Sequence, residues 1–484
     1  MRYLALLMVM TTTAFLSAQV KLIDPGQRPE APPAPPVFKL KIHKQAAPSS
    51  ALRYRLYPET RELVEGNAAQ SYYRAFAPKW QRLTHAKDYA EKSEKWLNQP
   101  LSEFQEKEVS FAQHQAGEVR QGSLKTYCEW ELTPRFRDKG FETLLPEIQG
   151  FRELARVLAL DCRAQLKTGR LDKAIEDVRS GLIFGRHVAD GPTLIQGLVG
   201  VACASMMAPR LEEILQQPGS PNLYWALANL PKPLIDFRKP LEGEKIVMDF
   251  FLPGFREMLK VKKPQAMSQE QLLACVDRFH RLTEEQKESG FSDLMKKAGF
   301  SAMAALNQPA AVKLLSEHGL DAKHVEKLPP LQTVFLAELL TYDQIFDEML
   351  KRRGAPLPLL REKLMDLEKT MKQPLPKVAS PIPLGTLSRL VVPAVQRAML
   401  APYRLERKLA ALQTIEAIRL QAAKDKAWPA SPEQVTMVPL PCDPETGKPF
   451  PFLKEGKRIV LMVGPPAGEK PLYYNSYSYE LELE

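Results

Sequence analysis

Apolar side chains recur at every third or fourth position between residues 151 and 188, which read FRELARVLALDCRAQLKTGRLDKAIEDVRSGLIFGRHV. This spacing predicts two amphipathic helices, and Thr168-Gly169 is placed to separate them. The first row consists of Phe151, Leu154, Ala155, Leu158, Cys162 and Leu166, and the second of Leu171, Ala174, Ile175, Val178 and Leu182. Two such rows joined by a short turn predict an antiparallel hairpin buried against further helices.

The next segment, residues 191–209, carries no charge over its nineteen residues. It is long enough to cross a membrane, but Gln196, three glycines and two prolines make insertion unfavourable. We predict a helix buried in the protein core instead. Gly197, Gly200 and Ala204 would let a neighbouring helix approach it closely.

Proline interrupts the remaining helical patterns. The chain contains 42 prolines, more than the usual share of about 5%, which predicts many short helices that end near a proline. We expect two short helices within residues 52–76, with Gly66-Asn67 as the stop between them. The pattern also predicts helix in residues 86–120 and a half-buried helix over residues 331–352.

The pattern changes after residue 400. One long helix is defined by Leu405, Leu409, Leu412, Ile415, Ile418 and Ala422. Residues 441–466 and 472–484 then alternate in the manner of strands. The C-terminal part is therefore predicted to be a long helix followed by a small antiparallel β module.

The N-terminus has the pattern of a secretory signal. Arg2 precedes an apolar run over residues 3–16, and the small residues Ser17 and Ala18 follow. We predict cleavage after Ala18 and export to the periplasm or cell envelope. The run is short for a membrane span, so we expect peripheral or no membrane association after cleavage; an uncleaved anchor is the alternative.

Five segments follow from these patterns. Residues 1–18 are the signal peptide, and residues 19–49, which include PGQRPEAPPAPP, form a proline-rich tether. Residues 50–373 form the helical domain, residues 374–400 a linker and helix start, and residues 401–484 the long helix with the β module. Folded structure is expected to begin near Ser50.

The formal net charge is +10 and the pI is about 9.1. The basic residues are scattered, and the densest runs, residues 260–263 and 351–353, lack the interleaved aromatics of a nucleic-acid surface. We therefore expect a solvated basic surface and no nucleic-acid partner. Weak adsorption to anionic envelope polymers is the alternative.

No recognisable catalytic motif is present. The sequence contains no glycine-rich phosphate loop and no GxSxG, HExxH or EF-hand pattern. The histidines are dispersed; His318 and His324 lie near Glu317 and Asp321, but Gly319 interrupts any helix between them, which favours a polar loop over a metal site. We assign no catalytic residue, no cofactor and no metal ligand.

Five cysteines lie far apart in the chain, so at most two disulfides can form. They are Cys128, Cys162, Cys203, Cys275 and Cys442. No pair has metal-ligand spacing, and no CxxCH haem motif occurs. Cys162 and Cys203 sit on apolar helix faces, which is typical of buried core residues.

Some acidic residues allow two interpretations. Asp443, Glu445 and Thr446 precede Gly447, which suits a tight turn on conformational grounds and a calcium site as the alternative. The pairs Glu212 with Glu213 and Glu129 with Glu131 are interpreted as surface charge. They would support acid–base hydrolysis only if a cleft brought carboxylates together.

Four tyrosines crowd the C-terminus: Tyr473, Tyr474, Tyr477 and Tyr479. Aromatic groups of this kind stack on sugars or pack on a partner. The simpler prediction is a set of cross-strand pairs on a half-exposed sheet.

The segment GRLDKAIEDVRSGL resembles the second half of a tetratricopeptide repeat, with Gly169 as the turn glycine and Ala174 and Gly181 as the small packing residues. Asp161 and Arg186 depart from the pattern, and no second copy occurs at a period of 34 residues. The resemblance implies a repeat-like helical pair. The predicted fold is mainly α: an irregular, tetratricopeptide-like array of helical hairpins with a small C-terminal antiparallel β-hairpin module.

Longer strings resemble a family of exported helical proteins from planctomycete-type bacteria. They are TLIQGLVGVACA, QQPGSPNLYWALANLPKPLIDFRKPLEGE and CEWELTPRFRDKGFETLLPEIQGFRELARVLAL. The resemblance extends from about Ala51 to the C-terminus. It implies export and a helical fold, and it supplies no catalytic residue.

The turn DPETGKPF at residues 443–450 resembles the turn before the hairpin of pilin-like and pseudopilin domains. The N-terminal apolar helix with its processing site that defines pilins is not found here, so the resemblance implies a shared local structure.

These observations favour an exported helical scaffold that binds a protein or peptide partner in the envelope. An envelope hydrolase acting on a glycan or peptide through carboxylates is the first alternative. A pilus-like or secretion component is the second.

We predict that the exported chain begins at Gln19. Signal processing requires small residues before the cleaved bond, so Ala18→Arg should leave the signal segment attached. Intact-mass measurement of protein from the envelope fraction checks both variants. A wild-type protein that retains residues 1–18 would contradict the prediction.

Overall fold

The computed structural model describes residues 34–76, 89–132, 134, 145–283, 290–352, 354–372 and 395–484. The predicted signal peptide, much of the tether and most of the predicted linker lie outside these ranges. The fold is mainly α, with 57% of residues in helices and a small C-terminal sheet. The predicted fold class is confirmed.

The predicted hairpin is formed by α7 (Leu145–Lys167) and α8 (Leu171–Ala189). Gly169 ends α7 with φ +73°, and the Arg170 amide donates to the Gln165 carbonyl at 2.8 Å. This is the glycine-based end of a helix that the sequence pattern indicates. All six residues of the first predicted row are buried, and so are four of the five in the second.

The uncharged segment forms α9 (Leu194–Ser205), which continues into α10 (Ala208–Leu215). The stretch Leu194–Leu215 is long and apolar enough to cross a membrane, but most of it is buried inside the protein. A Cβ built at Gly200 would lie 2.4 Å from the Ala189 amide nitrogen of α8. Bare glycine backbones therefore let α8 and α9 cross at close range, as predicted.

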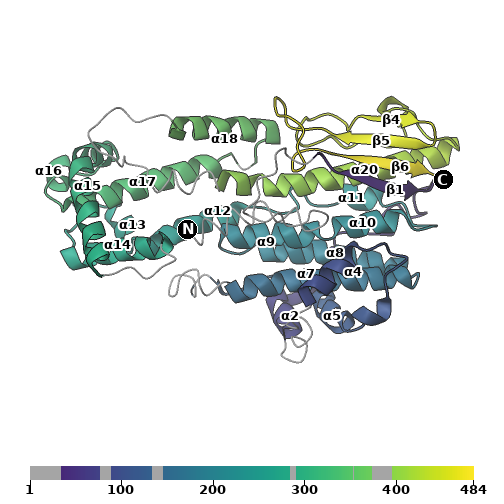
Figure 1. The fold of residues 1–484 in the computed structure, drawn as a ribbon, viewed down its shortest axis with the longest axis horizontal. Coiled ribbons are helices and arrows are strands. Elements are labelled where there is room, and N and C mark those ends of the chain that lie inside the picture. The colour runs from purple at the N-terminus through teal and green to yellow at the C-terminus, as the bar shows by residue number, and fades with distance from the viewer. Residues whose placement is uncertain are drawn as a thin grey trace.

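The N-terminal segments pack against this hairpin, with α2 and α5 below it in Figure 1. They comprise η1 (Thr60–Glu62), β2 (Val64–Asn67), α2 (Ala68–Ala75), α4 (Tyr89–Asn98), η2 (Glu106–Val109), α5 (Ala112–Ser123) and β3 (Lys125–Tyr127). The prediction of two helices within residues 52–76 was wrong for the first one. Pro58 disfavours helix at the residue before it, and Gly66 with Asn67 belongs to β2, which pairs in parallel with β3.

A second group of helices extends the molecule to the left in Figure 1. It comprises α12 (Arg238–Phe251), α13 (Phe255–Met258), α14 (Gln269–Thr283), α15 (Gly290–Glu317), α16 (Ala322–Val325), α17 (Pro330–Leu350) and α18 (Leu357–Lys372), and the short α11 (Tyr224–Ala228) precedes it. The predicted helix over residues 331–352 corresponds to α17. It is more buried than predicted, because α12, α13 and α15 all contact it.

The C-terminal part combines α20 (Ala401–Asp425) with β4 (Phe452–Glu455), β5 (Arg458–Val463) and β6 (Tyr477–Leu483). The sheet has a fourth strand, β1 (Val37–Ile42), in the order β1-β6-β5-β4. β1 is parallel to β6, so folded structure begins well before Ser50 and within the segment predicted to be tether. Phe38, Leu40 and Ile42 alternate with two lysines, which is the two-residue period of a strand.

We predict that Gly200→Ala lowers the free energy of unfolding by about 1–3 kcal/mol, because the added methyl group overpacks the α8–α9 crossing. The matched control is Gly117→Ala inside α5, where a Cβ meets no atom within 4 Å. The control should be neutral or stabilising by about 0.5–1 kcal/mol. Denaturant titration of both variants checks this; equal effects would contradict the close crossing.

Candidate functional site

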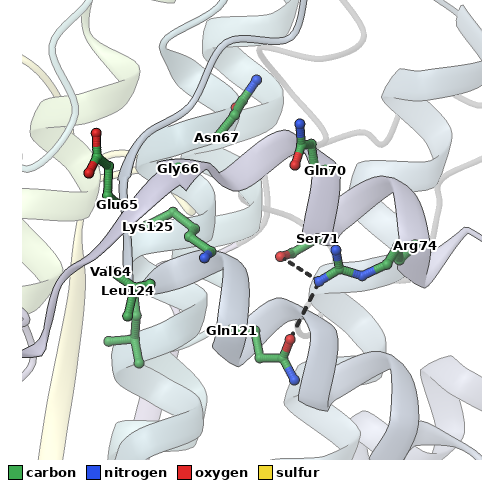
Figure 2. A pocket seen from close by; sticks show the side chains of 10 residues that line it. All are labelled: Val64, Glu65, Gly66, Asn67, Gln70, Ser71, Arg74, Gln121, Leu124 and Lys125. Carbon is green, nitrogen blue, oxygen red and sulfur yellow. Dashed lines mark hydrogen bonds between the residues drawn. The ribbon is translucent and has the colours of Figure 1, made fainter.

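The structure contains a polar pocket of about 280 Å³ where β2 and β3 meet α2 and α5. We call it the Arg74–Lys125 pocket. Its lining residues, drawn in Figure 2, are Val64, Glu65, Gly66, Asn67, Gln70, Ser71, Arg74, Gln121, Leu124 and Lys125.

Local geometry brings these residues together. The Val64 amide donates to the Leu124 carbonyl at 2.8 Å, which joins β2 to the start of β3. Asn67 then caps α2, because its Oδ1 accepts from the Ala69 amide at 3.1 Å. Asn67 Nδ2 also donates to the Glu129 carbonyl at 2.8 Å, beyond the end of β3. The first turns of α2 therefore stand directly over the two strands.

The Arg74 guanidinium is held by three neighbours. Its Nε donates to Glu118 Oε2 at 2.9 Å, and its Nη2 donates to Ser71 Oγ at 3.0 Å and Gln121 Oε1 at 3.4 Å. Its Nη1 bonds to none of the described residues. Arg74 thus has a fixed orientation, and the two N–H groups of its Nη1 can donate to a ligand.

Lys125 lies on the opposite wall and forms no ion pair with any residue that the structure describes. Its side chain passes over Gly66, where a Cβ would lie 3.7 Å from Nζ. Gly66 has φ +135°, a conformation that favours glycine. In Figure 2 the Lys125 ammonium and the Arg74 guanidinium reach toward the same space, while the Glu65 carboxylate points away from it.

The pocket suits binding better than acid–base chemistry. Its side chains offer several hydrogen-bond donors and one carboxylate, that of Glu65, so the lining holds no carboxylate pair. None of these residues was a sequence-based candidate. The available signal was the spacing of Gln70, Ser71 and Arg74, which share one helix face, but the β2–β3 pairing that places them was not visible.

The predicted turn at residues 443–447 is formed, and its acids bind arginines. Arg407 Nε and Nη2 donate to Asp443 at 2.7 and 2.6 Å, and Arg361 donates to both oxygens of Glu445 at 2.8 Å. The Gly447 amide donates to the Asp443 carbonyl at 2.8 Å, and Gly447 has φ +67°. The carboxylates are therefore engaged by cations of the protein itself.

The helix is broken at Gly319 between the two histidines, as predicted, and His324 lies on the short helix α16. α15 ends at Glu317, Gly319 has φ +109°, and the ring of His324 bonds to the Pro264 carbonyl at 2.8 Å. Within the described ranges, no group of three His, Cys, Asp or Glu side chains is arranged to hold a metal ion.

The interpretation of Glu212 and Glu213 as surface charge was wrong. Glu212 is buried, and its Oε1 accepts from Lys408 Nζ and from the Tyr479 hydroxyl, each at 2.6 Å. Glu213 pairs with Arg163 at 3.0 Å and Arg210 at 3.4 Å. Lys408 of α20 binds Glu212, and Glu213 is bound by Arg163 of α7 together with Arg210 of its own helix. Helix periodicity gives no sign of the partners on other elements. Glu129 and Glu131 are exposed.

The four tyrosines divide into two pairs. Tyr479 is fully buried, and the rings of Tyr477 and Tyr479 lie 5.7 and 5.4 Å from Phe38 of β1. Tyr473 and Tyr474 pack edge-on at 5.2 Å outside the sheet, and Tyr474 is half exposed. The partner of the strand tyrosines is thus an N-terminal residue that the sequence pattern did not indicate.

All five cysteines are free thiols. Cys162 and Cys203 are fully buried, as predicted, and burial raises the pKa of the Cys203 thiol to about 12. A thiol with so high a pKa is a poor nucleophile at neutral pH.

A buried charge cluster was missed by the sequence analysis. Asp161 of α7 and Asp177 of α8 are fully buried, and both accept hydrogen bonds from Arg120 of α5, Asp161 at 2.8 Å. Burial raises the pKa of Asp177 to about 8, and the Asp161 carboxylate adds to this while Arg120 opposes it. The cluster joins three helices in the core.

Comparison with known proteins gives no match, whether to a protein-family model, a curated protein or a solved structure.

We predict that the contribution of Asp177 to the free energy of unfolding falls as pH rises from about 4 to about 8, whereas buried His187, whose pKa is lowered to about 4, contributes the opposite slope below about pH 6.5. In this range folded Asp177 keeps a proton that the unfolded chain, with a pKa near 3.8, has released. Asp177→Asn should remove up to about 1.4 kcal/mol per pH unit of this slope. Denaturant titrations at several pH values check this.

The matched control for this measurement is Glu482→Gln, which removes an exposed carboxylate on β6. Its stability should follow the wild-type pH slope. If Asp177→Asn also keeps the wild-type slope, folded Asp177 does not hold a proton in this pH range, and the prediction is wrong.

Proposed function

We propose that this chain is an exported helical scaffold of the cell envelope that binds a protein or peptide partner through the Arg74–Lys125 pocket. The observation that supports this proposal most directly is that the pocket is already organised without a ligand. Arg74 is fixed by Ser71, Gln121 and Glu118, so its side chain loses little conformational freedom on binding.

The pocket is built on rigid elements, which supports a binding role. α2 is anchored to α8 by the Tyr72 hydroxyl and the His187 ring at 2.7 Å, and Gln115 of α5 donates to the Ala75 carbonyl of α2 at 3.0 Å. Ser123 at the end of α5 bonds to Ser180 of α8 at 3.2 Å. A site carried by packed helices holds its geometry better than one on a loop.

The envelope location rests on the N-terminal signal pattern and on the resemblance to exported helical proteins of planctomycete-type bacteria. Both stay predictions.

Neither alternative function has an observation in its favour as specific as the pocket. For a hydrolase, the paired carboxylates Asp161 and Asp177 have no exposed surface. For a pilus-like component, the long helix α20 is buried on most sides by its own chain. The binding role is therefore the function that the geometry supports best.

We predict that a photo-crosslinking residue at Gln70, an exposed position of the pocket, captures a discrete partner from envelope extract. Lys125→Glu in the same protein should abolish the adduct, because it reverses the charge of one wall. Gel analysis with mass spectrometry identifies the captured species.

The control places the same residue at Met437, which is 44% exposed and belongs to the C-terminal part. It should yield no adduct that depends on Lys125. Identical adducts from both positions, or none from Gln70, would contradict the proposed function.

A further inference from the structure

The Arg74–Lys125 pocket offers hydrogen-bond donors whose acceptors are missing. Arg74 Nη1, Lys125 Nζ and Gln121 Nε2 bond to none of the described residues, whereas the acceptor Gln121 Oε1 is occupied by Arg74. A donor that loses its water to a bound ligand costs free energy unless the ligand supplies an acceptor. A ligand group that brings acceptors therefore suits these three donors.

The charges define that group further. The positive charge of Arg74 is matched by Glu118 at 2.9 Å, whereas Lys125 has no counterion in the part of the chain that the structure describes. Glu65 lines the pocket but points away from the two cations (Figure 2). One positive charge is thus left over, which matches a singly charged anion better than a phosphate dianion.

The backbone beside the pocket is suited to an extended chain. In β2, the amides of Val64 and Gly66 are directed to β3, at 2.8 Å from the Leu124 carbonyl and 3.3 Å from Thr126 Oγ1. β2 is an edge of a two-stranded sheet, and within the described residues it pairs with β3 alone. Its other edge can therefore take an added strand.

We propose that the pocket binds the carboxylate group of an extended peptide. Arg74 Nη1 and Lys125 Nζ hold its two oxygens from opposite walls, and the peptide backbone follows β2 past Glu65. This inference rests on the proposed function and names the ligand chemistry of the same site. The carboxylate is either the C-terminus of the peptide or an aspartate or glutamate side chain.

The test selects binders for the whole mature chain from a library of random heptapeptides with free C-termini and measures each by fluorescence anisotropy. Removing the recognised carboxylate should weaken binding by roughly ten-fold or more, as expected for a charge-assisted pair. Amidation of the C-terminus and Asp→Asn or Glu→Gln changes identify which carboxylate is bound.

Protein variants tie the effect to the pocket. Lys125→Gln should weaken binding by a similar factor and leave the denaturation midpoint unchanged, because Lys125 pairs with no described residue. The matched control, Lys454→Gln on exposed β4, should bind as wild type does. In the Lys125→Gln protein, the peptide with the recognised carboxylate and the peptide without it should bind with the same affinity.

Three results would overturn the inference: peptides that bind equally well without any carboxylate, inorganic phosphate that competes at lower concentration than acetate, or no binder in the library. If Gln70 still captures its partner in any of these cases, the proposed function stands and only the ligand class is wrong. If peptide binding and the crosslink from Gln70 are both absent, the proposed function and the proposed ligand class are both wrong.

Discussion

The buried ammonium group of Lys408 is the interaction on which the architecture depends. It lies 2.6 Å from Glu212 Oε1 and 3.6, 4.9 and 4.6 Å from the ring centres of Phe38, Tyr477 and Tyr479. Taking a charge out of water costs several kcal/mol unless its partners are all present. Lys408 is therefore stable only when α10, α20, β1 and β6 meet at one point, which holds β1 and β6 against the helical body.

Two arginines extend this requirement along α20. Arg407 binds Asp443 and the Gly464 and Asn475 carbonyls, which fixes the loops of the sheet. Arg419 pairs with Glu416 at 2.8 Å and donates to the His43 carbonyl at 2.9 Å and the Ser220 carbonyl at 3.1 Å. Arg407, Glu416 and Arg419 are all buried. α20 is a central helix whose charged side chains are satisfied by distant parts of the chain.

This arrangement decides which surface is left for binding. The inner face of the sheet is committed to α20 and α10, whereas α2 and α5 lie on the other side of the α7–α9 layer (Figure 1). The pocket there has one fixed cation and one without a counterion among the described residues, and its supporting helices are held by Tyr72, His187 and Gln115. The buried charges of α20 are paired and structural, while the half-exposed charges of the pocket are available to a ligand.

The sequence by itself determined the features that depend on neighbours within one or two helical turns. The α7–α8 hairpin, its end at Gly169, the burial of α9 and the turn at Gly447 follow from residue spacing and from glycine's access to positive φ. Only the tertiary structure decided the pairing of β1 with β6, the inward position of Glu212 and the β2–β3 contact that creates the pocket. These depend on residues far apart in the chain, and a periodic pattern carries no information about which distant partner will satisfy a strand edge or a charge.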